Sequence, residues 1–282
     1  MKRVLIVGAN SYIGKSFAGY AKDQFDITTV DTMNGEWKTV SFAGYDSIFH
    51  VAGIAHVKTT KANEQLYYDI NCNLALDVAT KAKAEGVKQF VFLSSIYVYI
   101  NGLQTSQIIS KSTLPNPGTV YGKSKHMAEQ ELQKLASDSF KLCFVRPPMV
   151  YGPGCKGNFP SLVKLARLTP VFPCFPNKRS MIYIDNLCEH LNNLISDNYE
   201  GITMPHNSEY VNTTDLVKTI RNILGKRTHS IKIFNMFIVF LSKRVSVVNK
   251  LFGDLCYAMQ GNEYTYNITG FDESVSRSVP MA

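Results

Sequence analysis

A tyrosine and a lysine lie one helical turn apart in the segment YGKSK at residues 121–125. Tyr121 and Lys125 are at positions i and i+4, so they share one face of any helix that contains them. A tyrosine with a pKa of about 10 is a poor base at neutral pH, and we expect the Lys125 ammonium to lower that pKa by stabilising the phenolate. Ser95 adds a hydroxyl that can hydrogen-bond the same substrate oxygen. The three side chains predict acid–base chemistry at a hydroxyl or carbonyl group.

A glycine-rich turn follows the first apolar run of the chain. The segment GANSYIG at residues 8–14 leads into a predicted helix at 15–22. Glycines at such a turn let the backbone approach a pyrophosphate, and the N-terminus of the next helix offers free N–H groups to it. Ser11 stands where a dinucleotide fingerprint has its middle glycine, so the turn alone also fits a plain strand-to-helix connection.

Asp31 strengthens the dinucleotide interpretation of this turn. It lies 23 residues after Gly8, at the end of the second apolar run. A carboxylate there can accept a hydrogen bond from the adenosine ribose 2′-OH and repels a 2′-phosphate. We therefore expect NAD(H) as the cofactor, with NADP(H) as the alternative because Lys38 is near enough to offset the charge.

Strand-like apolar runs alternate with helix-length segments through the first two thirds of the chain. The segments 64–85 and 124–137 have the amphipathic i, i+3, i+4 pattern of surface helices. The alternation predicts an α/β fold with a parallel, doubly wound sheet. The predicted strands are Arg3 to Val7, Ile27 to Val30, Ser47 to Val51, Gln89 to Leu93, Leu142 to Arg146 and Met181 to Ile184.

Pro and Gly become frequent after Tyr151, where the regular alternation ends. We expect a dinucleotide-binding domain at residues 1–152 and a smaller, mainly substrate-binding domain at 153–282. Within the latter, residues from about 181 to 195 are expected to return to the first domain's sheet.

The apolar run at 231–241 is far shorter than the roughly 20 residues of a membrane-spanning helix, and we expect no membrane span. It is expected to form a core helix or strand. A membrane-surface or partner contact is the alternative, because Lys243 and Arg244 follow the run.

The composition is that of a globular protein. The 282 residues are 45% hydrophobic and 18% charged, which excludes a disordered or fibrous chain. The net charge of +8 is scattered and comes with no helix-turn-helix or zinc signature, so we expect no nucleic-acid partner. The six cysteines show no ligand spacing, which predicts no metal site, no disulfide framework and a reducing, cytoplasmic compartment.

Several co-linear motifs resemble the extended short-chain dehydrogenase/reductase family of nucleotide-sugar epimerases, dehydratases and reductases. The resemblance runs nearly from end to end and implies a Rossmann-type fold. Its motifs are GANSYIG at 8–14, HVAG at 50–53, LSSIYVY at 93–99, YGKSK at 121–125, RPPMVYGPG at 146–154 and RSMIYIDNL at 179–187.

The resemblance assigns roles to individual residues. Ser95, Tyr121 and Lys125 match the family's catalytic triad, and Lys125 also matches the contact to the nicotinamide ribose. On the substrate side, Asn158 matches a binding position, and Arg179 matches an arginine whose planar fork grips the diphosphate. The residues that match cofactor contacts are Gly8, Ser11, Tyr12, Ile13, Gly14, Asp31, Ala52, Gly53, Asn71, Tyr121, Lys125 and Pro148. The segments 64–85 and 124–137 match the helices that pair two subunits, which implies a homodimer.

The residues after Ser95 argue against one of the reactions that the family catalyses. The family's 4,6-dehydratases carry an Asp-Glu pair where this chain has Ile96 and Tyr97, which cannot supply the extra acid and base of dehydration. Hydride transfer at a sugar C4 remains. The C-terminal half resembles bacterial polysaccharide enzymes that reduce UDP-linked 4-keto-6-deoxy-N-acetylhexosamines, so we expect a 4-ketoreductase. An NAD-dependent UDP-sugar 4-epimerase and a dinucleotide-binding sensor without turnover are the alternatives.

Overall fold

The chain forms two compact units in the computed structural model, which describes all residues except 56–59, 103–107, 234, 243, 260–264 and 281–282. The first unit comprises Met1–Ile100, Pro115–Pro147 and Leu187–Pro205. The second unit comprises Asn101–Leu114, Pro148–Asn186 and His206–Ala282. The chain thus passes between the units several times, whereas the sequence suggested one main boundary after residue 152 and one return at about 181 to 195.

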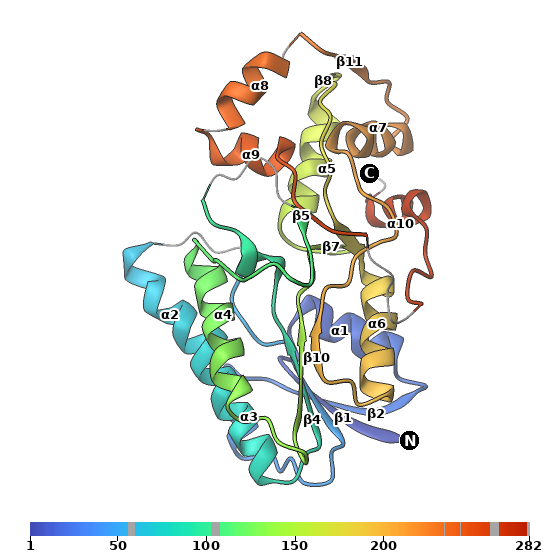
Figure 1. Cartoon of the computed structure of the whole chain (residues 1–282). Helices are drawn as coiled ribbons and strands as arrows, with labels where there is room; N and C mark the ends of the chain where they lie inside the picture. The colour runs from blue at the N-terminus through green and yellow to red at the C-terminus, as the bar shows by residue number, and fades with distance from the viewer. Residues whose placement is uncertain (56–59, 103–107, 234, 243, 260–264, 281–282) are drawn as a thin grey trace. The chain divides into compact units, whose positions relative to one another are not determined.

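A six-stranded, entirely parallel sheet forms the centre of the first unit (Figure 1). The strand order is β2-β1-β3-β4-β6-β10, with helices on both faces, so the predicted doubly wound α/β fold of Rossmann type is confirmed. The strands are β1 (Lys2–Val7), β2 (Phe25–Val30), β3 (Ser47–His50), β4 (Gln89–Leu93), β6 (Lys141–Val145) and β10 (Gly201–Thr203).

Burial along the strands reflects their place in this sheet. Every residue of β3 is buried, whereas the edge strand β2 buries only its two ends. A central parallel strand is covered on both faces and therefore becomes a continuous apolar run. The buried side chains of Ser47 and Gln89 are paired: Ser47 on β3 donates to Gln89 on the adjacent β4 at 2.7 Å, and Gln89 donates to the Leu194 carbonyl at 3.0 Å.

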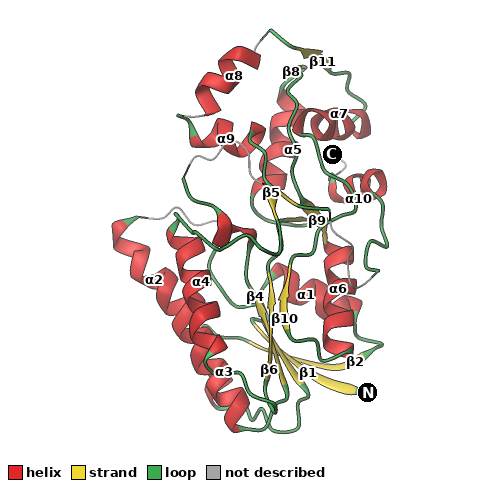
Figure 2. Ribbon diagram, viewed as in Figure 1, coloured by secondary structure: helices red, strands yellow, loops and turns green. Residues whose placement is uncertain are grey.

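Helices cover the two faces of the sheet (Figure 2). On one face lie α1 (Tyr12–Tyr20) and α6 (Ile184–Ser196), and Phe17 of α1 packs edge-on against Phe49 at 5.5 Å. The other face is covered by α2 (Glu64–Tyr68), the π-helical segment η3 (Asp69–Asn73), α3 (Leu74–Ala84) and α4 (Val120–Gln133). Short 3₁₀ turns connect these elements: η1 (Glu36–Lys38), η2 (Lys61–Asn63) and η4 (Ile96–Tyr99).

Two predicted helices differ from the observed ones in detail. The segment predicted as one helix at 64–85 is interrupted by the π turn η3, which the apolar periodicity does not reveal. The helix predicted at 124–137 begins four residues earlier, because the Thr119 side chain accepts a hydrogen bond from the Gly122 N–H at 3.0 Å and caps it.

The second unit contains three short parallel strand pairs and five helices among its described residues. β7 (Met149–Tyr151) pairs with β9 (Met181–Tyr183), β8 (Val171–Pro173) with β11 (His229–Ile231), and β5 (Ile108–Ile109) with β12 (Cys256–Tyr257). The helices are α5 (Asn158–Leu168), α7 (Thr213–Ile223), α8 (Asn235–Ser242), α9 (Ser246–Phe252) and α10 (Phe271–Ser278).

The return of the chain to the main sheet differs from the expectation for about 181–195. Met181–Tyr183 pairs with β7 in the second unit, and the sixth strand of the main sheet is β10. From Leu187 onward α6 belongs to the first unit. β10 has three residues, of which Ile202 is exposed, so its sequence carries no strong strand pattern. No helix in the described part of the chain is long and apolar enough to cross a membrane.

Candidate active site

The strands of the first unit bring the candidate residues to one edge of the sheet. Val7 lies opposite both Val30 and His50, and Leu93 lies opposite Val145. Because all these strands are parallel, the residues that follow them share the carboxyl edge, where doubly wound sheets bind ligands.

The turn after β1 requires glycine for steric reasons. Gly8 has a φ of 117°, and a Cβ there would lie 2.6 Å from the Ala52 backbone nitrogen. A Cβ on Gly14 would lie 2.9 Å from Val51 Cγ1. The turn is therefore tight and packs closely against Val51 and Ala52, as the first and third glycines of a dinucleotide-binding turn do.

The helix after this turn begins with the predicted cofactor residues. Ser11 caps α1, its hydroxyl accepting from the Gly14 N–H at 3.4 Å, and Tyr12 and Ile13 form the first turn. The Ser11 substitution in the fingerprint thus supplies an N-cap.

Asp31 follows β2 and is held in place by its neighbours. Its carboxylate accepts hydrogen bonds from the backbone N–H groups of Thr32 at 2.6 Å and Met33 at 3.1 Å, and from the Asn10 side chain. Those backbone hydrogen bonds lower the pKa of Asp31 below its usual value. The residue is therefore an ionised acceptor next to the glycine-rich turn.

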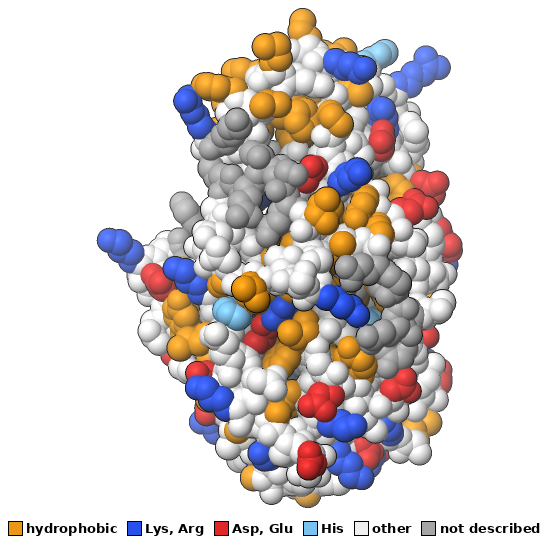
Figure 3. All heavy atoms as spheres, viewed as in Figure 1, with side chains coloured by type: hydrophobic (Ala, Val, Ile, Leu, Met, Phe, Trp, Pro, Cys, Tyr) orange, Lys and Arg blue, Asp and Glu red, His pale blue; other side chains and the backbone are white. Residues whose placement is uncertain are grey.

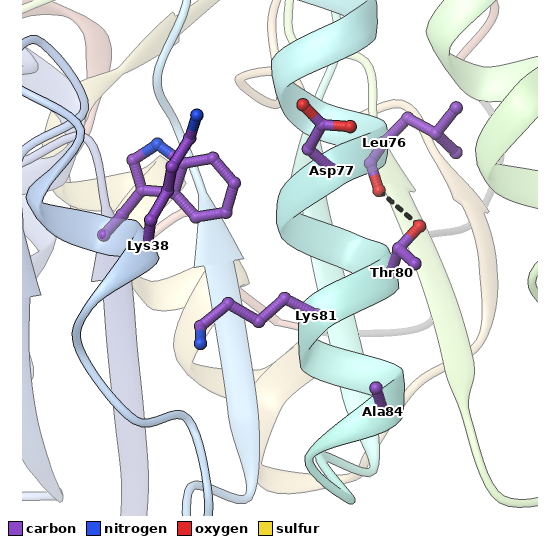
Figure 4. A pocket seen from close by; sticks show the side chains of 7 residues that line it. Lys38, Leu76, Asp77, Thr80, Lys81 and Ala84 are labelled. Carbon is purple, nitrogen blue, oxygen red and sulfur yellow. Dashed lines mark hydrogen bonds between the residues drawn. The ribbon is translucent and has the colours of Figure 1, made fainter.

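Lys38, which sequence reasoning placed near Asp31, is engaged elsewhere. Its Nζ lies 5.8 Å from the centre of the Trp37 ring. Both residues line a hollow of about 500 Å³ between η1 and α3, together with Leu76, Asp77, Thr80, Lys81 and Ala84 (Figure 4). Asp31 and the glycine-rich turn do not line this hollow, so Lys38 gives no support to an NADP(H) phosphate site there.

Asn71 connects three parts of the site. It is fully buried in η3, where its Oδ1 accepts from the Ile54 N–H at 2.9 Å and its Nδ2 donates to Ser124 Oγ at 3.0 Å. A Cβ on Gly53 would lie 2.8 Å from Asn71 Oδ1 and 3.2 Å from Lys125 Nζ. Gly53, Asn71 and Lys125 thus converge, with the buried Ala52 beside them.

The Lys125 side chain is buried, and its ammonium group contacts other residues of the first unit. Its Nζ donates to the Leu93 carbonyl at 2.9 Å and lies 4.5 Å from the centre of the Phe92 ring. Burial lowers the pKa of Lys125 to about 8, while the nearby Glu129 carboxylate opposes that shift.

Tyr121 is affected by burial more than by its lysine neighbour. Burial raises the pKa of Tyr121 to about 12, and a side-chain hydrogen bond with Ser95 opposes the change. The expectation that Lys125 lowers this pKa is therefore wrong for this structure, in which the ammonium is bound to the Leu93 carbonyl. Tyr121 is held as the neutral phenol, which is a proton donor.

Ser95 completes the group at the end of β4. It is 8% exposed, and its Oγ accepts from the Tyr97 N–H at 3.3 Å. A Cβ on Gly122 would collide with the Tyr97 carbonyl oxygen, so α4 packs closely against η4. The structure brings Ser95, Tyr121 and Lys125 together in one unit, an arrangement that can exchange a proton with a substrate oxygen.

Sequence reasoning missed a buried ion pair beside this group. Arg146 and Glu129 form two hydrogen bonds, and both side chains are 5% exposed. Arg146 also donates to the Tyr99 hydroxyl. Two signals in the sequence could have suggested the pair: an arginine directly after a buried strand, and a glutamate at i+4 from Lys125.

The remaining candidates lie in the second unit. Pro148 is buried and precedes β7. Asn158 is exposed and begins α5, after Gly157 with a φ of 93°. Arg179 donates from Nη1 to the Gly253 carbonyl at 2.9 Å. No cluster of potential metal ligands occurs among the residues that the structure describes.

Comparisons with known proteins agree on one family. The model of the "NAD dependent epimerase/dehydratase family" matches residues 4–191. A UDP-glucose 4-epimerase from Vibrio cholerae is 31% identical over 220 residues, which cover 74% of this chain and 67% of that protein.

Two further comparisons are informative. N-acetyl-alpha-D-glucosaminyl-diphospho-ditrans,octacis-undecaprenol 4-epimerase from Escherichia coli O157:H7 is 25% identical over 249 residues, covering 80% of this chain and 74% of that protein. The structure of a dTDP-4-dehydrorhamnose reductase from Bacillus anthracis, in complex with NADP, has a TM-score of 0.73 at 21% identity. The superposition covers 99% of this chain and 98% of the reductase chain, and this likeness shows the fold alone.

Proposed function

The chain belongs to the NAD dependent epimerase/dehydratase family, and on that premise we propose that it transfers hydride at C4 of a nucleotide sugar. The observation that carries the proposal is the convergence of Ser95, Tyr121 and Lys125 at the carboxyl edge of the sheet. A sensor without turnover has no need of a buried lysine beside a neutral phenol.

NAD(H) is the cofactor that the first unit fits. At Gly8, Gly14 and Gly53 a Cβ would collide with neighbouring protein atoms, so the turns of the site are closely packed. Asp31 provides an ionised acceptor for a ribose hydroxyl. When bound, the nicotinamide supplies or accepts the hydride.

The chain's own residues manage the proton and the substrate oxygen. For reduction, the Tyr121 hydroxyl gives its proton to the C4 oxygen as C4 receives hydride. The Ser95 hydroxyl donates a hydrogen bond to the same oxygen, and Lys125 would hold the ribose of the nicotinamide. Tyr121 is a protonated phenol at neutral pH, which is the form that a carbonyl reduction needs.

The proposed substrate is a UDP-linked 4-keto-6-deoxy-N-acetylhexosamine, a precursor of surface polysaccharide. Resemblance supports this choice, and Asn158 and Arg179 are proposed as its ligands in the second unit. A guanidinium suits diphosphate oxygens because its planar fork donates two parallel hydrogen bonds.

The second candidate is an NAD-dependent UDP-sugar 4-epimerase. It is favoured by the names of the relatives from V. cholerae and E. coli, both 4-epimerases. The same three residues serve that reaction in both directions. Dehydration is not proposed, because Ile96 is an apolar buried residue and Tyr97 offers only a phenol where that chemistry needs two carboxyl groups.

One experiment separates the candidates. The purified protein is denatured and its supernatant assayed for nicotinamide, and native protein is then mixed with NADH and the 4-keto sugar while absorbance at 340 nm is followed. A substrate-dependent loss of absorbance by protein without bound cofactor supports the 4-ketoreductase. Stoichiometric bound NAD with no net absorbance change supports the epimerase, and no conversion of any nucleotide sugar contradicts both.

A homodimer is proposed through the helices α2 to α4. Leu66 and Met127 on these helices are 48% and 45% exposed, which leaves apolar surface for a second copy. Sedimentation equilibrium at micromolar concentration tests this, and a strict monomer contradicts it.

A further inference from the structure

Helix α8 of the second unit presents its apolar side chains outward. Met236, Phe237 and Phe240 are 88%, 60% and 52% exposed, and their i, i+1, i+4 spacing places them on one face. The buried positions of the same helix are Ile238 and the small polar Ser242. The large apolar side chains of α8 therefore lie mostly on its exposed face and not on its buried face.

Two further exposed apolar residues, one before α8 and one within it, extend this apolar face. Ile233 precedes it at 81% exposure and Val239 adds 47%. In Figure 3, orange side chains gather over the end of the second unit where Figure 1 draws α8. Exposed clusters of this kind mark interaction sites, because single scattered apolar residues suffice for an ordinary surface.

The charged side chains along the chain on both sides of this face have one sign. No Asp or Glu occurs between Asp215 and Asp254. Among the described residues of this stretch, the exposed cations are Lys226, Arg227, Lys232, Arg244 and Lys250. The Arg244 guanidinium lies 4.2 Å from the centre of the Phe240 ring, so a positive charge borders the apolar face directly.

We propose that α8 docks the protein on an anionic lipid bilayer, with Met236, Phe237 and Phe240 entering the interface and Lys232 and Arg244 contacting lipid headgroups. The combination of exposed aromatic and aliphatic side chains with bordering cations is what such a surface attracts. A bilayer fits this pattern better than a protein partner, because it needs only exposed apolar side chains with a bordering positive charge, here the Arg244 guanidinium.

The geometry fits a helix that lies on the membrane. Eight residues extend about 12 Å, far less than the roughly 30 Å of a hydrocarbon core. The helix is also anchored to its own unit, since the Asn235 side chain donates to the Cys174 carbonyl at 2.9 Å. Docking therefore needs no unfolding of α8, only contact of its outer face.

Vesicle binding of the full chain tests the proposal without any substrate, so its result is independent of the proposed reaction. Sedimentation with vesicles of phosphatidylcholine, or of phosphatidylcholine with phosphatidylglycerol, measures partitioning at low and high salt. We expect binding to the anionic vesicles that weakens with salt. The variant Met236→Ser/Phe237→Ser/Phe240→Ser is expected to bind at least about tenfold more weakly.

Two matched variants complete the experiment. Ile202→Ser/Ile268→Ser removes exposed apolar side chains elsewhere, 46% and 53% exposed, and is expected to leave vesicle binding unchanged. Lys232→Gln/Arg244→Gln is expected to reduce binding to anionic vesicles alone. Unchanged thermal midpoints establish that the variants are folded.

Three results would overturn the proposal. One is wild-type protein that stays in the supernatant with anionic vesicles at low salt. Another is equal loss of binding in the Ile202→Ser/Ile268→Ser control. The third is a wild-type protein that does not bind vesicles, together with a triple α8 variant that forms a smaller oligomer than wild type. This would show that a second copy covers the face.

Discussion

Arg146 grips Glu129 at two points inside the first unit: Nε lies 2.8 Å from Oε1, and Nη2 lies 2.5 Å from Oε2. Glu129 is on α4, one turn after Lys125 and two turns after Tyr121. Arg146 directly follows β6. The ion pair therefore fixes the helix that carries two candidate catalytic residues to the carboxyl end of a central strand.

We expect removal of one partner of this ion pair to destabilise the protein strongly. Glu129→Gln leaves Arg146 buried without a counter-charge and should lower the free energy of unfolding by about 3–5 kcal/mol. Urea denaturation measures the change. The double variant Glu129→Leu/Arg146→Met removes both charges and should recover part of the loss. A double variant less stable than the single one would contradict this explanation.

We expect the buried Lys125 ammonium to lower the free energy of unfolding of the protein. Its folded-state pKa of about 8 lies below the ordinary value, so the unfolded chain binds more protons between about pH 8 and 10.5. Wild-type stability should thus rise across that window. Lys125→Met should raise the free energy of unfolding at pH 7 by about 1–3 kcal/mol while abolishing turnover.

The control for Lys125→Met is Lys123→Met, which changes an exposed lysine on the same helix. Its stability should follow wild type at both pH 7 and pH 10, as measured by urea denaturation. If Lys125→Met is the less stable protein at pH 7, the cost of burying this ammonium has been misjudged.

Tyr121→Phe removes only the hydroxyl that is proposed to move the proton. We expect turnover to fall by about 10²–10⁴-fold, while NADH affinity, measured by fluorescence titration, stays close to wild type. Lys123→Ala on the same helix serves as control and should keep full activity. Unchanged turnover in Tyr121→Phe would remove this residue from the mechanism.

Gly53→Ala tests the convergence with Asn71 and Lys125. The new Cβ would lie 2.8 Å from Asn71 Oδ1, so we expect NADH affinity to fall at least about tenfold, by calorimetric titration. Gly19→Ala adds the same methyl group in α1 with no atom within 4 Å and should stabilise the protein slightly. Equal affinities for the two variants would argue against a cofactor at Gly53.

Two buried histidines predict sensitivity to acid. His50 stacks against Phe90 and Phe92, with ring centres 5.8 and 6.0 Å away, and its nitrogens have no hydrogen-bond partner among the described residues. Burial lowers the pKa of His50 and of His190 to about 3. The unfolded chain therefore binds more protons between about pH 3 and 6.5, and stability should fall as the pH decreases through that range.

The measurement is urea denaturation at several pH values. Each histidine should contribute a slope of up to about 1.4 kcal/mol per pH unit, and His50→Leu should make the pH dependence shallower. An unchanged slope in that variant would show that His50 does not titrate on unfolding.

The sequence was sufficient for the parallel α/β sheet and for the spacing of Tyr121 and Lys125, because apolar runs and helical spacing are local properties of the chain. Gln89–Leu93 was predicted to the residue, since both of its faces are apolar. The π turn at Asn71 and the sixth strand β10 left no such local pattern.

The tertiary structure decided what surrounds the candidate residues. Lys125 and Tyr121 are adjacent by sequence alone, but only packing determines that the ammonium binds the Leu93 carbonyl and that burial raises the pKa of the phenol. The pairing of Arg146 with Glu129 and the outward face of α8 are likewise decided by packing. Desolvation, charge pairing and exposure depend on neighbours far away in the chain, which one-dimensional spacing does not specify.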